Sequence, residues 1–273
     1  MQELLCFDRV SYRYDSGDRE ALQSCSVRFY SGERIAVLGS NGAGKSTFFL
    51  LANGVLSPNS GTIAWKGQPV GKREKERMCL RRHIGLVFQD PDVQFLAGTV
   101  EEEISFGPMN LGIPEEDVHR RVEMALESLG LTDYRRRGPQ YLSGGEKRRV
   151  AIADILAMEP DIMLLDEPSS NLDPAGRRLL EHVLESLHQK GMTLVVATHD
   201  VDFAWRWADR VLVFHGGMLE RDDVPENVFA DQELLSRCAL EQPMLWQVAY
   251  FLGVPAPHCP EDLLKYKMGG QTE

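Results

Sequence analysis

The sequence predicts an α/β fold built on a parallel β-sheet, and three observations support this. An apolar strand over 34–38 runs into a glycine-rich turn and then a helix over 46–53. Between 161 and 197, a buried strand, an amphipathic helix and a second buried strand follow one another. From about 92 to 158 the pattern is helical. Strands that alternate with helices form parallel sheets with right-handed crossovers. Because the helical block interrupts this alternation, we expect it to be a helical subdomain inserted between two strands of the sheet.

The N-terminal part of the chain has the signals of further strands. Residues 4–14 and 25–29 are expected to form two of them, and 61–66 and 83–88 two more. The stretch from 71 to 82 is densely charged and mixes basic residues with glutamates. A solvated helix or loop is the favoured interpretation of this stretch, and a nucleic-acid patch the alternative.

The C-terminal part continues the alternation and then changes character. A helix is expected to begin at Asp173-Pro174 and to end at Gly191. We expect a main domain over 1–235 and a proline-rich extension over 236–273. The extension holds one apolar patch, 244–252, which is either a packing helix or an interface.

The composition limits the classes of function. The net charge of −11 argues against a dedicated nucleic-acid binder. The five cysteines are scattered without a C-x-x-C pair, which favours reduced thiols in a cytoplasm over metal ligation. No apolar run approaches the roughly 20 residues of a membrane span, and the N-terminus lacks the features of a signal peptide. We therefore expect a soluble chain unless a partner holds it at a membrane.

The glycine-rich turn after the 34–38 strand fits the phosphate-loop pattern G-x-x-x-x-G-K-[ST]. The turn from strand to helix aims backbone N–H groups and the positive helix end at one anion. Lys45 supplies a charge for the β/γ-phosphates and Ser46 a hydroxyl for Mg²⁺. A chance turn is disfavoured by the strand and helix on either side, so the sequence predicts binding of a nucleoside triphosphate. The residues expected to bind it are Gly39, Ser40, Asn41, Gly42, Ala43, Gly44, Lys45, Ser46 and Thr47.

Two acids end the apolar strand at 162–165. Because ligands bind at the carboxyl ends of parallel strands, Asp166 and Glu167 are expected to face the phosphates. Asp166 is placed to hold Mg²⁺, and Glu167 to act as base or orienter for the attacking water. A simple turn would also explain an acid pair, but the phosphate loop in the same chain makes that interpretation weaker.

A second possible anion site begins a helix over about 147–158. Leu142-Ser143-Gly144-Gly145-Glu146 combines a hydroxyl, free N–H groups and a helix dipole, although alone it could be an ordinary cap. These residues resemble the ABC ATPase signature, usually written LSGGQ. The other motifs of that family also occur in the family's order: Gln89 follows the 83–88 strand, Asn171-Leu172-Asp173 follows the acid pair, and Ala197-Thr198-His199-Asp200 follows the next strand. The resemblance covers about residues 3–230.

The resemblance implies a fold and a set of roles. It implies a P-loop NTPase fold with a mixed RecA-like core sheet, an antiparallel β subdomain and an inserted α-helical subdomain. Tyr14 matches the aromatic residue that stacks on adenine, whereas nearby Tyr12 is expected to be a strand residue in the core. Gln89 resembles the glutamine that touches Mg²⁺ and senses a membrane partner. His199 resembles the histidine that steadies the γ-phosphate and Glu167. The implied catalytic residues are Glu167, His199, Lys45 and Gln89, and the implied metal ligands are Ser46, Gln89 and Asp166.

In this family two ATPase domains enclose two nucleotides. The loop of one domain and the signature of the other meet at each ATP, so Ser143, Gly144, Gly145 and Glu146 are expected to complete the site of a second copy or a paralogue, with Asp173 at the seam. Glu146 departs from the usual glutamine and places a carboxylate near a polyphosphate. The three basic residues after it, 147–149, could offset this charge, so we expect activity to survive while the signature's nucleotide contacts stay open.

The segments 88–95 and 99–108 resemble the ATPases of energy-coupling-factor (ECF) importers. The chain has no long coiled-coil insertion or zinc module, which favours transport over DNA repair, chromosome organisation or translation. The resemblance is strongest to the cobalt-type component, with nickel and biotin-type vitamin importers as alternatives. It implies ATP and Mg²⁺, a homodimer, and integral-membrane T and substrate-binding components, with no nucleic acid. The expected location is the cytoplasmic face of the cell membrane, and the tail after 236 resembles an extension that can help to hold the dimer.

Overall fold

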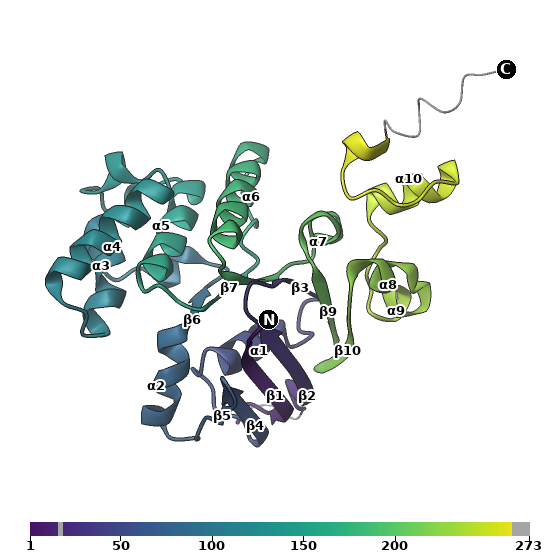
Figure 1. Cartoon of the computed structure of the whole chain (residues 1–273), viewed down its shortest axis with the longest axis horizontal. Helices are drawn as coiled ribbons and strands as arrows, with labels where there is room; N and C mark the ends of the chain where they lie inside the picture. The colour runs from purple at the N-terminus through teal and green to yellow at the C-terminus, as the bar shows by residue number, and fades with distance from the viewer. Residues whose placement is uncertain (16–18, 264–273) are drawn as a thin grey trace.

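A six-stranded sheet forms the centre of the protein in the computed structural model, which describes residues 1–15 and 19–263 (Figure 1). The strand order is β10-β9-β3-β8-β7-β6, and all neighbours are parallel except β10, which runs antiparallel to β9. The mixed sheet that the resemblance implies is therefore confirmed. Its strands are β3 (Arg34–Leu38), β6 (Ile84–Val87), β7 (Ile162–Asp166), β8 (Thr193–Ala197), β9 (Arg210–His215) and β10 (Met218–Asp223).

A smaller antiparallel sheet covers one face of the central sheet. Its order is β2-β1-β4-β5, with β1 (Glu3–Tyr12), β2 (Leu22–Tyr30), β4 (Ser60–Trp65) and β5 (Gln68–Pro69). Helix α1 (Lys45–Ala52) joins the two sheets: the Phe48 ring lies 5.0 Å from Phe7 of β1 and 5.1 Å from Phe214 of β9. Because α1 packs on both sheets, the position of the loop before it is fixed relative to them.

The protein has two hydrophobic cores, one on each face of the central sheet: the first surrounds α1 between the two sheets, and the second lies under the helices on the other face. Alternate residues of β3 divide between the cores: Ile35 and Val37 face α1, whereas Ala36 and Leu38 face the helices on the other side. This explains why the strand reads as a continuous apolar run. Among the covering helices are α6 (Pro174–Gln189) and α7 (Val201–Trp207).

Helices occupy the chain between β6 and β7, and Figure 1 shows them as a lobe beside the central sheet. The principal helices are α3 (Val100–Asn110), α4 (Glu115–Ser128) and α5 (Gly144–Ala157), with short 3₁₀ turns at Pro91–Val93, Thr132–Tyr134 and Pro139–Tyr141. One side of α4 carries apolar residues that are buried in the core, namely Val118, Val122, Ala125 and Leu126. The charged 71–82 stretch contains α2 (Glu74–His83), a largely exposed helix, in line with the favoured interpretation.

The sequence patterns assign no element to 198–235, where the structure has α7, β9, β10, α8 (Pro225–Ala230) and α9 (Gln232–Arg237). The edge strand β10 reads MLERDD, so it lacks both an apolar run and an alternating pattern. The sequence patterns also extend the first strand to residue 14, whereas β1 ends at Tyr12.

Helix α10 (Met244–Leu252) forms in the apolar patch of the extension, followed by a 3₁₀ turn over Pro260–Leu263. Trp246 packs edge-on against Trp205 at 5.1 Å, while Tyr250 and Phe251 are exposed. The patch is thus a helix that packs through one side and leaves apolar residues on the other. The remainder of the predicted extension, 264–273, lies outside the described residues. In the described ranges, no helix combines the length and apolar character needed to cross a membrane.

Candidate nucleotide-binding site

The loop between β3 and α1 approaches its neighbours so closely that glycine is required. Gly39 has φ +149° and Gly44 φ +106°. A Cβ at Gly39 would lie 2.3 Å from the Phe214 carbonyl oxygen, and one at Gly44 would lie 2.6 Å from that of Ala21. Gly44 is the N-cap of α1, so the loop leads directly into the helix end whose N–H groups lack helical partners.

Lys45 is the first residue of α1, and its side chain folds back onto this loop. Its Nζ donates hydrogen bonds to the carbonyl oxygens of Gly39 (2.6 Å) and Ser40 (3.3 Å), and the residue is only 7% exposed. Burial lowers the pKa of Lys45, and the charges of Glu167 and Asp166 act in the opposite direction. The ammonium group is therefore held against the loop by two carbonyl oxygens, within reach of the charges of Glu167 and Asp166.

Ser46 and Asp166 meet across the site. The Ser46 hydroxyl donates to Asp166 Oδ2 at 2.7 Å, which joins the start of α1 to the end of β7. The sequence separation of 120 residues is closed by the parallel sheet, because β3 and β7 are both neighbours of β8 and end at the same edge. A hydroxyl and a carboxylate are hard oxygen donors, the kind that Mg²⁺ prefers.

Glu167 is buried at 7% exposure and has φ +45°, a conformation unusual for a residue with a Cβ. Its N–H donates to the Ala197 carbonyl oxygen (2.9 Å), and its own carbonyl oxygen accepts from the Ser170 hydroxyl (2.8 Å). Glu167 Oε2 lies 2.9 Å from His199 Nδ1. The His199 side chain is 77% exposed, so the pair connects the buried carboxylate to the surface of the site.

These groups surround one cavity of about 650 Å³. Tyr14 lines it from the β-subdomain side, and its hydroxyl lies 3.2 Å from Thr47 Oγ1. Tyr12 is partly buried and packs edge-on against Tyr14 at 4.9 Å. The cavity brings together most of the residues predicted from sequence: Tyr14, Gly39, Ser40, Asn41, Gly42, Ala43, Gly44, Lys45, Ser46, Thr47, Gln89, Asp166, Glu167 and His199, with Ala21 as an unpredicted member.

The signature residues do not line this cavity in the same protomer. Ser143 is the N-cap of α5 and forms a capping box with Glu146: Glu146 Oε2 accepts from the Ser143 N–H at 2.6 Å, and Ser143 Oγ accepts from the Glu146 N–H at 3.4 Å. Gly144 and Gly145 form the first turn of this helix. Asp173 likewise caps α6, where Oδ1 accepts from the Gly176 N–H at 2.7 Å.

A protein-family model described as "ABC transporter" matches residues 22–170, more than half of the chain. The chain belongs to the ABC transporter family. The chain is therefore an ABC ATPase, and the cavity lined by the phosphate loop, the acid pair and His199 is its candidate nucleotide site.

Curated relatives and solved structures agree with this family. The energy-coupling factor transporter ATP-binding protein EcfA of Methanocaldococcus jannaschii is 43% identical over 85% of this chain and 83% of its own length. The EcfA2 protein of Methanospirillum hungatei is 44% identical over 91% of this chain but only 62% of its own length. These relatives identify an ABC ATPase of the ECF type.

Solved structures share the fold over most of the chain. The structure of cbiO1 from Clostridium perfringens, described as part of the ABC transporter complex cbiONQ, has a TM-score of 0.77 at 36% identity and covers 93% of this chain and 100% of its own. A dimeric ATP-binding cassette in a post-hydrolysis state, bound to ADP and phosphate, has a TM-score of 0.73 at 27% identity, with 81% of this chain and 99% of its own covered.

The three basic residues after the signature of this ABC ATPase have different surroundings. Lys147 pairs with Asp92 at 2.7 Å, and Arg148 is buried against the carbonyl oxygens of Phe88 and Gln89. The charge of Arg149 helps to lower the pKa of Glu146, after the hydrogen bonds from Ser143 and Tyr134. The expected offset is therefore supported for Arg149, whereas Lys147 and Arg148 contact other groups. The sequence does not mark Arg148 as a contact of the Gln89 carbonyl, because a basic run does not reveal which of its members is buried.

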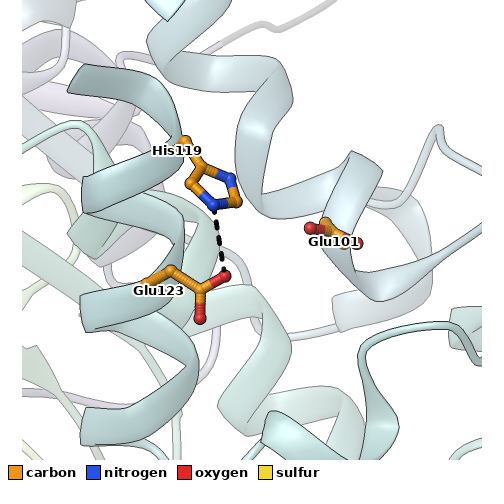
Figure 2. A group of neighbouring side chains, drawn as sticks. All are labelled: Glu101, His119 and Glu123. Carbon is orange, nitrogen blue, oxygen red and sulfur yellow. Dashed lines mark ion pairs between the residues drawn. The ribbon is translucent and has the colours of Figure 1, made fainter. Parts of the chain in front are cut away.

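A group of potential metal ligands occurs in the helical part, away from the ATP cavity. Figure 2 shows His119 and Glu123 on α4 with Glu101 of α3 nearby. Arg135 already pairs with both carboxylates, closely with Glu123 and at 3.6 Å with Glu101. Since an arginine neutralises these acids, we assign no metal centre to the group.

Proposed function

We propose that this ABC ATPase is the ATP-hydrolysing subunit of an ECF-type importer that energises uptake of a transition-metal ion, with cobalt the first candidate. The observation that carries this is the division of the site: the phosphate loop, Asp166, Glu167 and His199 line one cavity, and the signature lies outside it. The names of the EcfA relative and of cbiO1 support the ECF assignment, and the cbiONQ complex supports cobalt among the possible cargoes.

The loop residues bind the phosphates and Tyr14 stacks on the base in this proposal. Lys45 carries the positive charge nearest the loop, and the start of α1 adds free N–H groups. Ser46 and Asp166, 2.7 Å apart, with Gln89 lining the same cavity, fit the oxygen ligands of Mg²⁺. Mg²⁺ bound there would neutralise charge that develops on the phosphates.

Glu167 orients and deprotonates the attacking water in this scheme. Its carboxylate is buried, held at the backbone by Ala197 and Ser170, and steadied by His199. Such an arrangement supplies positioning and charge stabilisation, which account for most of the catalysis of phosphoryl transfer. Removal of the Glu167 carboxylate should therefore impair turnover more than binding.

A second copy of the chain completes each site. The Ser143, Gly144 and Gly145 N-terminus of α5 would contact the nucleotide of the partner, and Asp173 would lie at the seam. The dimeric cassette with ADP and phosphate supports this arrangement. Gln89 and the segment 92–110 would contact the membrane subunits, so the ATPase would work at the cytoplasmic face of the cell membrane.

Purification from membranes followed by uptake measurement tests the proposal. We expect the ATPase to co-purify with integral-membrane subunits, and the reconstituted complex to accumulate Co²⁺ only with Mg-ATP and not with the Glu167→Gln variant. Accumulation of Ni²⁺ or a biotin-type vitamin in place of Co²⁺ would reassign the cargo. A purified ATPase that never carries membrane subunits would favour the remaining alternative, an ABC ATPase outside transport.

A further inference from the structure

Arg148 joins the signature helix to the segment that bears Gln89. It lies on α5, five residues after Ser143, and is 3% exposed. Its Nη1 donates to the carbonyl oxygen of Phe88 at 2.6 Å, and its Nη2 donates to that of Gln89 at 2.6 Å. Both acceptors follow the last residue of β6 directly. The planar guanidinium therefore holds two successive carbonyls, a geometry that suits arginine and not lysine.

The same guanidinium reaches the turn after Glu167. Its Nη2 lies 3.5 Å from Ser170 Oγ, and that hydroxyl donates to the carbonyl oxygen of Glu167 at 2.8 Å. The Ser170 N–H donates to the same oxygen at 3.1 Å. Three segments that the proposed mechanism needs thus meet at one buried side chain: the helix of Ser143, the Gln89 segment and the Glu167 turn.

The surroundings of Arg148 make this contact hard to replace. The charges of Asp90 and Asp166 act on its buried guanidinium. An apolar side chain of similar length would leave the Phe88 and Gln89 carbonyls without this donor, and two part-buried, charge-assisted hydrogen bonds would be lost. Neighbouring Lys147 cannot substitute, because it faces Asp92.

We propose that Arg148 is a positioning residue of the ATPase, which fixes the Gln89 segment and the Glu167 turn to the helix of Ser143. The inference rests on the roles proposed above for Gln89, Glu167 and Ser143. Without Arg148, the signature helix would move independently of the catalytic carboxylate, so closure would no longer align the two. The phosphate loop would keep its own contacts, because none of them involves Arg148.

The full-length ATPase with Arg148→Met or Arg148→Lys tests this inference. For Arg148→Met we expect kcat to fall about 10- to 100-fold while the Kd for Mg-ATP, measured by calorimetry, changes less than about threefold. Arg148→Lys should recover part of kcat, because an ammonium can hold one carbonyl but not both. The matched control is Arg121→Met, which removes an arginine that contacts Met158 and Glu159 away from the ATP cavity and should keep kcat within about twofold.

The outcomes separate positioning from general damage. A kcat within about twofold of wild type in both Arg148 variants would overturn the inference, and so would a loss of ATP affinity that matches the loss of kcat. If Arg148→Met does not fold, Arg148→Lys decides by the same kcat and Kd comparison. Glu167→Gln in the same assay isolates the premise: wild-type turnover there defeats the proposed function, whereas an inactive Glu167→Gln beside active Arg148 variants defeats the Arg148 inference alone.

Discussion

At the scale of single residues, Glu167 shows how the site holds a carboxylate in place. Its left-handed backbone is a strained conformation, which persists only where surrounding contacts hold it. Ala197 and Ser170 supply these contacts at the backbone, and His199 lies against the carboxylate. The side chain thus has little freedom, which suits the water-orienting role proposed for Glu167.

Glu167→Gln is expected to bind ATP and to lose hydrolysis by roughly a hundredfold or more, because the amide keeps the shape but cannot accept a proton. Phosphate release measures kcat, and calorimetry measures affinity. Glu127→Gln, an exposed carboxylate on α4, is the control for the loss of a charge. Wild-type turnover in Glu167→Gln would contradict the role of this residue.

Lys45→Ala should act on binding itself. Removing the buried ammonium takes away one or two charge-assisted contacts with the phosphates. We therefore expect the Kd for Mg-ATP to rise about 10- to 100-fold. Calorimetry with the exposed Lys75→Ala as control measures this. An unchanged affinity would show that the loop does not hold the phosphates through Lys45.

At the scale of elements, the start of α5 shows what the Glu146 carboxylate contacts within its own protomer. Its carboxylate accepts from the Ser143 N–H, so it acts as part of the helix cap. The backbone hydrogen bond from Ser143, and then the Tyr134 hydroxyl, lower the pKa of Glu146. The carboxylate is therefore stabilised as an anion at the positive end of the helix, which is where a negative charge is favourable.

Glu146→Gln should lower stability slightly, by about 0.5 kcal/mol at neutral pH, and leave kcat within about threefold. A carboxyl with a depressed pKa contributes stability above its unfolded value, and this contribution is lost as pH falls through the folded value. Thermal unfolding of both proteins should therefore show a difference at pH 7 that shrinks toward pH 3. An equal difference at both pH values would mean that the charge of Glu146 has no part in the cap.

Asp154 is a second titratable group of α5, in the interior of the helical part. Burial raises its pKa to about 7, against the opposing hydrogen bond from Gln94 Nε2 (2.8 Å), and the charge of Glu103 adds to the rise. The buried Oε1 of Gln94 has no hydrogen-bond partner in the described part of the chain. An asparagine at 154 could accept from Gln94 as well as donate to it.

Asp154→Asn is expected to stabilise the protein at pH 8, by about 4 kcal/mol at most. The sign follows from the raised pKa: the native state keeps a proton that the unfolded state loses, so stability falls as pH rises from about 4 to 7. The variant should lack this slope in urea unfolding at several pH values, whereas the exposed Asp117→Asn should change stability little. An identical slope in Asp154→Asn and wild type would show that Asp154 is not the group responsible.

At the scale of the whole molecule, the features that depend on neighbouring residues could be predicted from the sequence, whereas those that depend on contacts between distant residues could not. The phosphate loop, the acid pair and the cap of α5 each depend on residues within a few positions, so spacing and residue type revealed them. Strand β10 and the packing of Arg148 depend on contacts with other segments of the chain. The local sequence pattern does not identify these contacts, so neither feature was predicted. The roles of Ser143 and Asp173 stay predictions, because they concern a surface that one protomer cannot complete.

A dimer assay tests this larger prediction. With Mg-ATP, the Glu167→Gln protein should elute from gel filtration as a dimer, because the nucleotide bridges the loop of one copy and the signature of the other while hydrolysis is blocked. Adding Ser143→Ala should shift it toward monomer without changing ATP affinity of the protomer, since Ser143 does not line the protomer's own cavity. Ser128→Ala, at the exposed end of α4, should leave the dimer intact. A monomer in Glu167→Gln with saturating Mg-ATP would remove the physical basis for the shared site, because each cavity would then have to work with its own residues alone.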